Sequence, residues 1–202
     1  MEGLRERKKR QTREAIAASA MALFSEHGFD AVTVADVARA ADVSEKTVFN
    51  YFPTKEDLIF ARAEEHLLAR AEAIRERVPG LPLTRVFEDE TMKFLERVEQ
   101  EGLDEAIAIV RVVQNSAVLR SRLLLAWERE SAVLVSAITD DEDDLVAETV
   151  VRALLWTHRL VFRAAVRRLL EGEGREKVAA DLREQARLAY ARLDLGLAGY
   201  AA

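Results

Sequence analysis

One stretch of the chain decides the fold: FSEHGFDAVTVADVARAADVSEKTVFNYFPTKEDL, residues 24–58. Thr33 can cap a helix, and Asp36 stands three residues later as a carboxylate variant of the capping box. Ser44 is the next cap candidate, and Thr54 opens a third such pattern that should start a longer helix. Several short helices are therefore predicted, with a tight turn between the second and third, which is the layout of a helix-turn-helix.

The segment before this stretch is predicted to be a helix of its own. Ile16, Ala20, Leu23 and Phe24 recur at the spacing that places side chains on one helical face. Gly28 is well placed to adopt the left-handed conformation that ends a helix, and Phe29 can make the accompanying apolar contact.

The rest of the chain is also predicted to be helical, because strand-like alternation is nearly absent and 3.6-residue periodicity appears almost everywhere. The clearest interruption is Val-Pro-Gly-Leu-Pro at residues 78–82. We predict an all-α fold, in which residues 1–57 form a three-helix helix-turn-helix DNA-binding domain and residues 58–202 a larger helical domain. A helix-turn-helix does not need this second domain, which must therefore dimerise, sense a ligand or catalyse. The further helices are expected at residues 58–77, 83–100, 104–115, 117–138, 144–170 and 175–195.

The chain has 202 residues, no cysteine and a net charge of −6. The lack of cysteine excludes a disulfide framework and a thiolate zinc site. The charge is unevenly distributed, because residues 1–13 hold six basic and two acidic side chains, whereas residues 14–57 hold three basic and eight acidic ones. A basic N-terminal arm is therefore the expected source of attraction to phosphates, and the alternative is a solvated helix start.

Nothing in the sequence suggests a membrane protein. No apolar run approaches the roughly 20 residues that span a bilayer. The N-terminus is charged, unlike a secretory signal. We expect a cytoplasmic protein without membrane contact.

Residues 24–58 resemble the DNA-binding domain of the tetracycline-repressor (TetR) family. The resemblance covers about the first quarter of the chain, and the remainder is similar only in being all-helical and of similar length. The family usually has glycine in the turn where this chain has Asp42, and aspartate tolerates the left-handed region better than most residues. The sequence around residues 48–52 also resembles actinobacterial members, some of which are grouped as binders of acyl-CoA-like ligands. The matching positions are Phe24, Gly28, Thr33, residues 41–44, Phe49, Tyr51, Phe52 and Lys55.

A recognition helix presents its N-terminal side chains to base edges in the major groove. Lys46 can donate to guanine, Glu45 can accept from cytosine, and Phe49 can touch a thymine methyl group. Flanking polar groups are expected to grip phosphates, with Lys55 at a helix start that also favours an anion. The complete predicted DNA-binding set is Thr33, Ser44, Glu45, Lys46, Thr47, Phe49, Asn50, Tyr51 and Lys55.

Each of these residues also has a purely structural interpretation. Thr33 and Ser44 cap helices whether or not DNA is present. Tyr51 can be a packing residue, and Lys55 can be solvated. Glu45 can stabilise the positive end of the helix dipole at the N-terminus instead of accepting a hydrogen bond from a base.

The segment at residues 145–170 is apolar on two faces. One stripe consists of Val146, Val150, Ala153, Thr157, Val161 and Ala164, and the other consists of Val151, Leu155, His158, Phe162 and Leu169. A helix of this kind is buried on both faces, either entirely within its own domain or partly against another subunit. In the resembled family the last two helices form the dimer interface. The resemblance therefore implies a homodimer, and twofold symmetry then implies a palindromic operator.

By the same resemblance, an effector site is expected among the middle helices. Arg111 interrupts an apolar run at residues 107–113, where it can bind an anionic ligand group or pair with a carboxylate. Core packing is the alternative for every candidate. The expected protein is a repressor that an unidentified small molecule releases from DNA, with no other cofactor. The predicted ligand-binding set is Phe87, Met92, Arg111, Gln114, Trp127, Trp156, His158 and Phe162.

An enzyme and a protein-binding helical scaffold are the two other classes to weigh. His27, His66 and His158 are far apart, and no pair has the spacing of metal ligands on a helix. The chain has no Gly-rich phosphate loop and no nucleophile elbow. We therefore expect no catalytic residue and no metal site, and a test of DNA binding separates a regulator from a scaffold.

Overall fold

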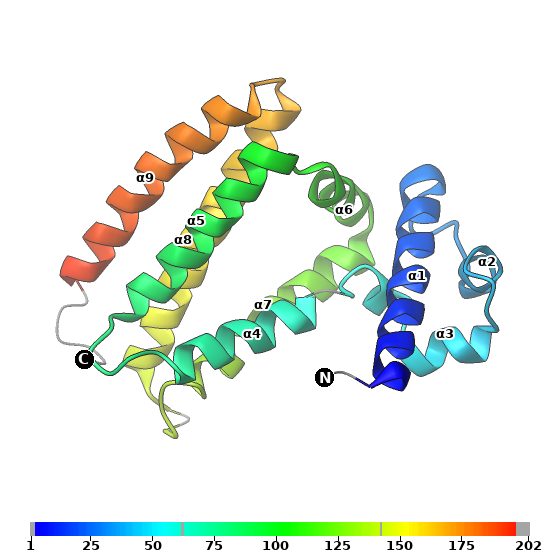
Figure 1. The fold of residues 1–202 in the computed structure, drawn as a ribbon, viewed down its shortest axis with the longest axis horizontal. Coiled ribbons are helices and arrows are strands. Elements are labelled where there is room, and N and C mark those ends of the chain that lie inside the picture. Colours follow the sequence, from blue (N-terminus) through cyan, green and yellow to red (C-terminus); the bar gives the residue numbers. More distant parts are fainter. Residues whose placement is uncertain (1–2, 62, 142, 197–202) are drawn as a thin grey trace. The chain divides into compact units, whose positions relative to one another are not determined.

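The computed structural model describes residues 3–61, 63–141 and 143–196 (Figure 1). These residues form helices and connecting turns, with no strand among them. The predicted all-α fold is confirmed, as are the helices that follow the breaker at residues 78–82. The helices are α1 Leu4–His27, α2 Val34–Ala40, α3 Glu45–Tyr51, the short 3₁₀ helix η1 Glu56–Leu58, α4 Ala63–Arg75, α5 Leu83–Glu101, α6 Asp104–Asn115, α7 Ala117–Val135, α8 Leu145–Leu170 and α9 Arg175–Gly196.

The chain forms two compact units. The first comprises the described residues up to 65 together with residues 105–125, and the second comprises residues 66–104 and the described residues from 126 onward. The predicted division between residues 57 and 58 does not coincide with these units, because α6 and the start of α7 pack with the helix-turn-helix. The functional division into DNA-binding and ligand-binding parts stays a prediction.

The core of the first unit explains this arrangement. Three residues of the predicted apolar face of α1, Ile16, Ala20 and Phe24, are fully buried, and Leu23 is partly buried. Val37 of α2 and Val48 of α3 are buried in the same cluster. Val112 and Val113 of α6 join the same cluster. Figure 1 shows α2 and α3 lying beside α1 in this unit. The short helices thus gain stability from shared burial, since seven-residue helices are marginal alone.

Both ends of α1 bear on the predictions. At its C-terminus Gly28 adopts a φ of 83°, and its N–H donates to the carbonyl of Phe24 at 3.0 Å. The rings of Phe24 and Phe29 lie 5.1 Å apart, so the predicted helix end is confirmed. At its N-terminus the helix already begins at Leu4. The basic segment is therefore the first turns of α1, apart from residues 1 and 2, which lie outside the described residues.

The helix predicted over residues 58–77 is wrong in its first part. The capping pattern at Thr54 is present, since Thr54 N donates to Asp57 Oδ2 at 3.0 Å and Asp57 N donates to Thr54 Oγ1 at 3.3 Å. Only η1 follows, and α4 begins several residues later. Leu58 and Ile59 pack in the first core, whereas Leu67 packs in the second. The chain breaks its helical path between these two cores.

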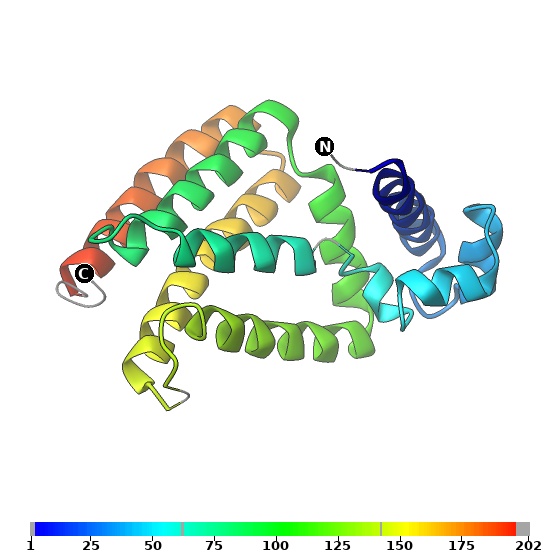
Figure 2. The ribbon, with the colours of Figure 1, turned by 60° about the horizontal axis from the view of Figure 1, so that its bottom comes forward.

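The second unit is built on three long helices. Figures 1 and 2 both show α5, α8 and α9 running alongside one another. Helix α5 buries Phe87, Phe94 and Leu95 at helical spacing, and α9 contributes Leu182 and Tyr190 to the same interior. This interior is therefore a helix-on-helix core.

Helix α8 buries or partly buries its two predicted apolar stripes, except for Val146 at its start, which is 55% exposed. Val150 of one stripe and Val151 and Leu155 of the other are all at most 2% exposed. A separate line of its surface carries Trp156 and Leu160, which are 50% and 40% exposed. Of the large apolar side chains left open on α8, Val146 belongs to a predicted stripe, whereas Trp156 and Leu160 do not.

None of the helices in the described part of the chain is long and apolar enough to cross a membrane.

Candidate functional site

Thr33 fixes the start of α2. Its Oγ1 accepts a hydrogen bond from Asp36 N at 3.2 Å, and its own N–H donates to Asp36 Oδ2 at 3.0 Å. These hydrogen bonds, together with Arg39, hold the pKa of Asp36 below its usual value. The predicted capping box is therefore confirmed, and Asp36 stays ionised at the positive end of the α2 dipole.

The turn between α2 and α3 contains the residue that replaces the usual glycine. Asp42 has a φ of 53°, the left-handed conformation expected at this position. Val43 N donates to Ala38 O at 2.9 Å across the turn, which closes the end of α2. The aspartate carries a conformational cost of roughly 1 kcal/mol that glycine would not, and the turn forms nonetheless.

Helix α3 is held by its cap and by its buried side. Ser44 Oγ accepts from Thr47 N at 3.1 Å and lies 2.8 Å from Thr47 Oγ1. Val48 is only 1% exposed and anchors the helix in the first core. Because this inner side is fixed, the outward direction of every other side chain on α3 is fixed as well.

The outer side of α3 carries the predicted base-reading residues. Phe49 is 46% exposed although it is a large apolar side chain. Glu45, Lys46 and Asn50 are polar or charged residues and are exposed as well. Tyr51 is partly buried against the first core. The structure thus brings together on one short helix the exposed side chains of Glu45, Lys46, Phe49 and Asn50.

Lys55 is turned toward the protein. Its Nζ donates to the carbonyl of Phe29 at 2.5 Å and lies 4.1 Å from the centre of the Phe29 ring. Burial lowers the pKa of Lys55, although the charge of Asp30 opposes that shift. The ammonium group has three donors, so a phosphate can be met by an N–H other than the one that binds the Phe29 carbonyl. The predicted phosphate contact stays a prediction.

Comparisons with known proteins agree with this geometry. Residues 16–61 match the model for bacterial regulatory proteins of the tetR family, and this match covers the second half of α1 together with α2, α3 and η1. These residues form a DNA-binding domain of the tetR family. It is 29% identical over 171 residues to TcmR, an HTH-type transcriptional regulator of Streptomyces glaucescens, covering 80% of this chain and 76% of that protein.

Solved structures extend the likeness to the fold of the whole regulator. GusR of Salmonella enterica superposes with a TM-score of 0.60 at 20% identity, covering 91% of this chain and 94% of GusR. FadR of Bacillus subtilis, solved in complex with stearoyl-CoA, gives a TM-score of 0.53 at 14% identity and covers 86% and 96% of the two chains. The two proteins share the fold of this chain.

The basic start of α1 divides into two parts. Arg13 points inward, where its Nη2 donates to Ala61 O at 2.7 Å and its guanidinium lies 5.0 Å from the centre of the Phe52 ring. Lys8 and Lys9 are exposed on the first turns of the helix. Arg13 therefore supports the fold, whereas Lys8 and Lys9 are exposed together with Arg5, Arg7 and Arg10.

The second unit contains a buried ionic network that the sequence analysis missed. Arg70 of α4, whose side chain is only 8% exposed, donates to both carboxylate oxygens of Glu90 on α5 at 2.7 and 2.6 Å. It also donates to Glu130 of α7. Arg159 of α8 donates to the second oxygen of Glu130 at 2.5 Å and stacks over the Trp127 ring at 4.5 Å. Four helices thus meet through charged side chains.

The charges in this network stabilise each other. Burial alone would raise the pKa of Glu90 and lower that of Arg70. Their mutual hydrogen bonds and charges outweigh burial, so the pKa of Glu90 is lowered and the pKa of Arg70 is raised. Both residues therefore remain charged in the interior, where leaving either one unpaired would be costly.

A second polar group adjoins the network through Thr91, which is fully buried. Its Oγ1 lies 2.8 Å from His158 Nδ1 and 2.9 Å from the Tyr190 hydroxyl. Burial lowers the pKa of His158 to about 4 and raises the pKa of Tyr190 to about 12. Both side chains are therefore neutral near pH 7 and can exchange hydrogen bonds with an uncharged polar partner.

The predicted ligand-binding residues do not form one group. The rings of Trp127 and Trp156 meet edge to face, with 6.2 Å between their centres. The guanidinium of Arg159, which belongs to the ionic network, lies over the Trp127 ring. His158 and Phe162 both contact Phe94, with ring centres 5.9 and 5.6 Å away.

The other four predicted residues are dispersed. Phe87 is 1% exposed in a neighbouring apolar cluster, and Met92 is partly buried on the α9 side of α5. Arg111 and Gln114 belong to the first unit and are exposed. The role of the whole set in binding a ligand stays a prediction.

The missed residues had one usable signal. Arg70 falls on the same helical face as Leu67, Ala71 and Ile74, so a charge interrupts an otherwise apolar stripe. The same reasoning had singled out Arg111, which the structure leaves exposed. The partners of Arg70 lie 20 and 60 residues away, and no local pattern identifies them. In the described residues no group of three or more His, Asp or Glu side chains could hold a metal ion.

Proposed function

We propose that this chain is a homodimeric repressor that binds a palindromic operator through α2 and α3 and that a small molecule releases from it. The observation that carries the proposal is the outer side of α3. A large aromatic side chain, Phe49, stands exposed there between Lys46 and Asn50 while Val48 anchors the helix from within. An exposed aromatic residue flanked by donors and acceptors suits a surface that meets base edges.

The chemistry of α3 assigns roles to its side chains. Lys46 donates to guanine acceptors, Asn50 pairs with adenine, and Phe49 contacts a thymine methyl group. Glu45 accepts from cytosine, or else stabilises the N-terminus of α3. The phosphate-gripping groups are the remaining members of the predicted set, Thr33, Ser44, Thr47, Tyr51 and Lys55, together with the exposed lysines of α1.

The homodimer is proposed from apolar side chains left exposed on the last two helices. On α8, Trp156 and Leu160 lie open, and on α9 Leu188 and Leu195 are 61% and 75% exposed. Exposed apolar residues in such number mark an interaction surface more often than a solvated one. Twofold pairing through these helices would duplicate α3 and give an operator with two related half-sites.

The effector is proposed to bind in the polar interior of the second unit, around Trp127, His158 and the ionic network. Buried titratable groups with displaced pKa values mark functional sites. FadR, which shares the fold, was solved in complex with stearoyl-CoA. Binding that stabilises one arrangement of this interior would release DNA only if it disfavours the DNA-bound conformation. The expected place of action is the cytoplasm, with DNA as the partner.

Footprinting on genomic fragments from upstream of the gene tests this proposal. We expect one protected site with twofold symmetry, and light scattering of the complex should give two chains per half-site pair. Failure to protect any fragment at low salt, where phosphate contacts are strongest, would rule out DNA binding. A protected site bound by a single chain would instead rule out the dimer.

A further inference from the structure

The first unit contains a cleft that the proposed DNA and effector sites do not use. It has a volume of about 500 Å³ and lies between the end of α1, the segment leading into α2, and α6. This volume falls in the range of pockets that hold small organic molecules, about 300–1,000 Å³. All the residues that line the cleft belong to the first unit.

The floor of the cleft is apolar. It includes Phe24, Phe29 and Val112, which are 1%, 6% and 7% exposed. The two phenylalanine rings lie 5.1 Å apart and are tilted by 55°. Because these three side chains are almost fully buried already, the apolar surface that a ligand would cover comes mainly from Ala31 and Ala108, which also line the cleft and are less buried. Covering that surface favours an occupant with an aromatic or aliphatic body.

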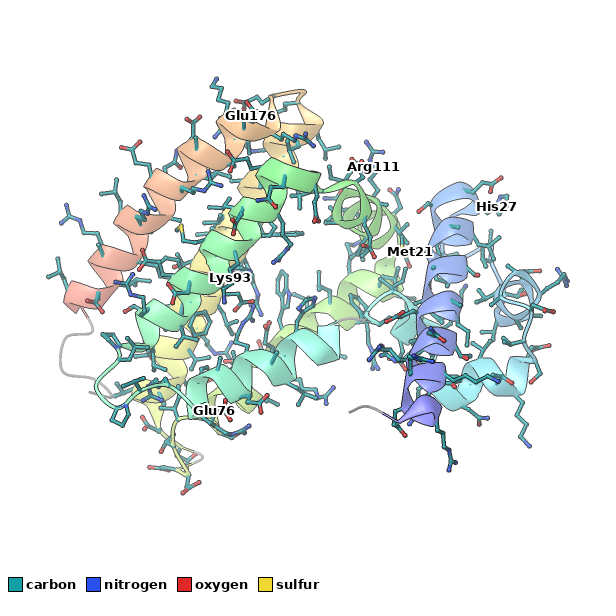
Figure 3. All side chains as sticks on the ribbon, viewed as in Figure 1. Met21, His27, Glu76, Lys93, Arg111 and Glu176 are labelled. Carbon is teal, nitrogen blue, oxygen red and sulfur yellow. The ribbon has the colours of Figure 1, made fainter. Side chains whose placement is uncertain are left out.

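The rim of the cleft supplies one uncompensated cation. Arg111 projects from α6, which is apolar on both sides of it, and within the described part of the chain it forms no ion pair or hydrogen bond. Figure 3 labels Arg111 on α6 and His27 at the end of α1, the two helices that bound the cleft. An exposed guanidinium beside an apolar floor favours a ligand that carries a carboxylate.

The one acidic residue that lines the cleft is already engaged. Asp30 Oδ1 accepts from Ser116 Oγ at 3.3 Å, and the charge of Lys55 acts on the same carboxylate. The Asp30 charge is therefore largely offset within the first unit, and the positive charge of Arg111 remains for a ligand.

We propose that this cleft binds a small organic acid. The apolar body of the ligand covers the apolar lining of the cleft, and its carboxylate meets the guanidinium of Arg111. The site is separate from the proposed effector site in the second unit and does not depend on it. The acid would also touch Asp30, the residue whose charge acts on Lys55.

The test uses the full-length protein and a matched pair of probes, 1-naphthoate and the uncharged 1-naphthalenemethanol. Affinity is measured by calorimetry, and the location is read from amide shifts of Gly28 and Asn115 against indole N–H shifts of Trp127 and Trp156. We expect naphthoate to shift the first two signals and to bind roughly tenfold more tightly than the alcohol.

Two variants decide the role of Arg111. Arg111→Gln should weaken naphthoate binding by roughly tenfold and leave the alcohol unaffected, since a charge-assisted hydrogen bond is lost. Arg97→Gln removes an exposed charge from α5 in the second unit and should change neither affinity. Any of three results would overturn the proposal. Naphthoate would not bind at all, the two variants would bind it with equal affinity, or the shifts would be confined to the tryptophan signals.

Discussion

Arg122 of α7 donates a hydrogen bond to Asp57 of η1, with 3.1 Å between Nη2 and Oδ1. Asp57 also accepts from Thr54 N through its other oxygen. The segment that carries Lys55 is therefore fastened to α7 inside the first unit. The charge of Arg122 contributes to lowering the pKa of Asp57, against the opposing effect of burial.

Arg122→Gln should loosen this segment. The Arg122 side chain is 46% exposed, so we expect a loss of at most about 1 kcal/mol in unfolding free energy. Operator affinity should fall by a few-fold because Lys55 is less well positioned. Urea unfolding and operator titration measure the two effects. Unchanged operator affinity would show that α7 does not position the segment.

Lys46→Met and Lys55→Met should separate base reading from phosphate contact. Lys46 is exposed on α3, so its loss should alter base preference and leave thermal stability unchanged. Lys55 contacts DNA only through phosphate in our proposal, so its loss should weaken all sequences alike and reduce the salt slope by about 1. It should also lower stability, because Nζ holds the Phe29 carbonyl. Identical binding profiles for the two variants on a panel of operator sequences would contradict these assignments.

The exposed start of α1 should supply non-specific attraction to DNA. Replacing Lys8 and Lys9 together by glutamine preserves the helix better than deleting residues 1–10 would. We expect weaker binding to all DNA and a salt slope reduced by up to about 2. A variant with Lys93 and Arg97 changed to glutamine loses the same charge from the second unit and serves as the control. If the two double variants had equal salt slopes, the α1 lysines would have no specific role in attracting DNA.

Arg70→Met should be strongly destabilising. It leaves Glu90 and Glu130 without their buried partner, which costs about 3–5 kcal/mol in comparable cases. Arg152→Met is the matched control, since Arg152 bridges Glu128 at 2.7 Å and Glu148 at 2.8 Å on the surface, and such pairs contribute about 1 kcal/mol or less. Chemical denaturation compares the two. If both variants lost a similar amount of unfolding free energy, the internal network would not be protected from solvent.

Stability should fall as the pH drops from about 6.5 toward 4. The pKa of His158 is about 4 in the folded protein and 6.5 otherwise, so only the unfolded chain takes up this proton in that range. Each pH unit should cost up to about 1.4 kcal/mol. The charges facing His158 are Glu90, Glu130, Arg70 and Arg159.

Unfolding of wild type and His158→Gln between pH 7 and pH 5 tests this dependence. The variant should lose less stability than the wild type over this range. A common slope for both proteins would assign the effect to other groups.

The sequence predicted the first unit better than the second for a physical reason. The caps at Thr33 and Ser44 and the left-handed Asp42 depend on neighbours three or four residues away, so local patterns reveal them. The ionic partners of Arg70 come from α5 and α7, and only the packed core brings them together.

The same limit explains the two structural surprises. The break between Leu58 and α4 arises because adjacent residues pack in different cores. Helix α6 was predicted with correct bounds, but its amphipathic pattern does not say which core it covers, and it packs in the first one.

The contribution of α6 and the start of α7 to the first core sets a rule for recombining regulators of this family. A chimera that exchanges only residues 1–65 would pair the transplanted helices with Val112, Val113 and Leu119 of a different sequence. The mismatch would lie in the core that α1, α2 and α3 share. Transplanting residues 105–125 along with residues 1–65 would carry the operator preference and its structural support as one exchangeable module.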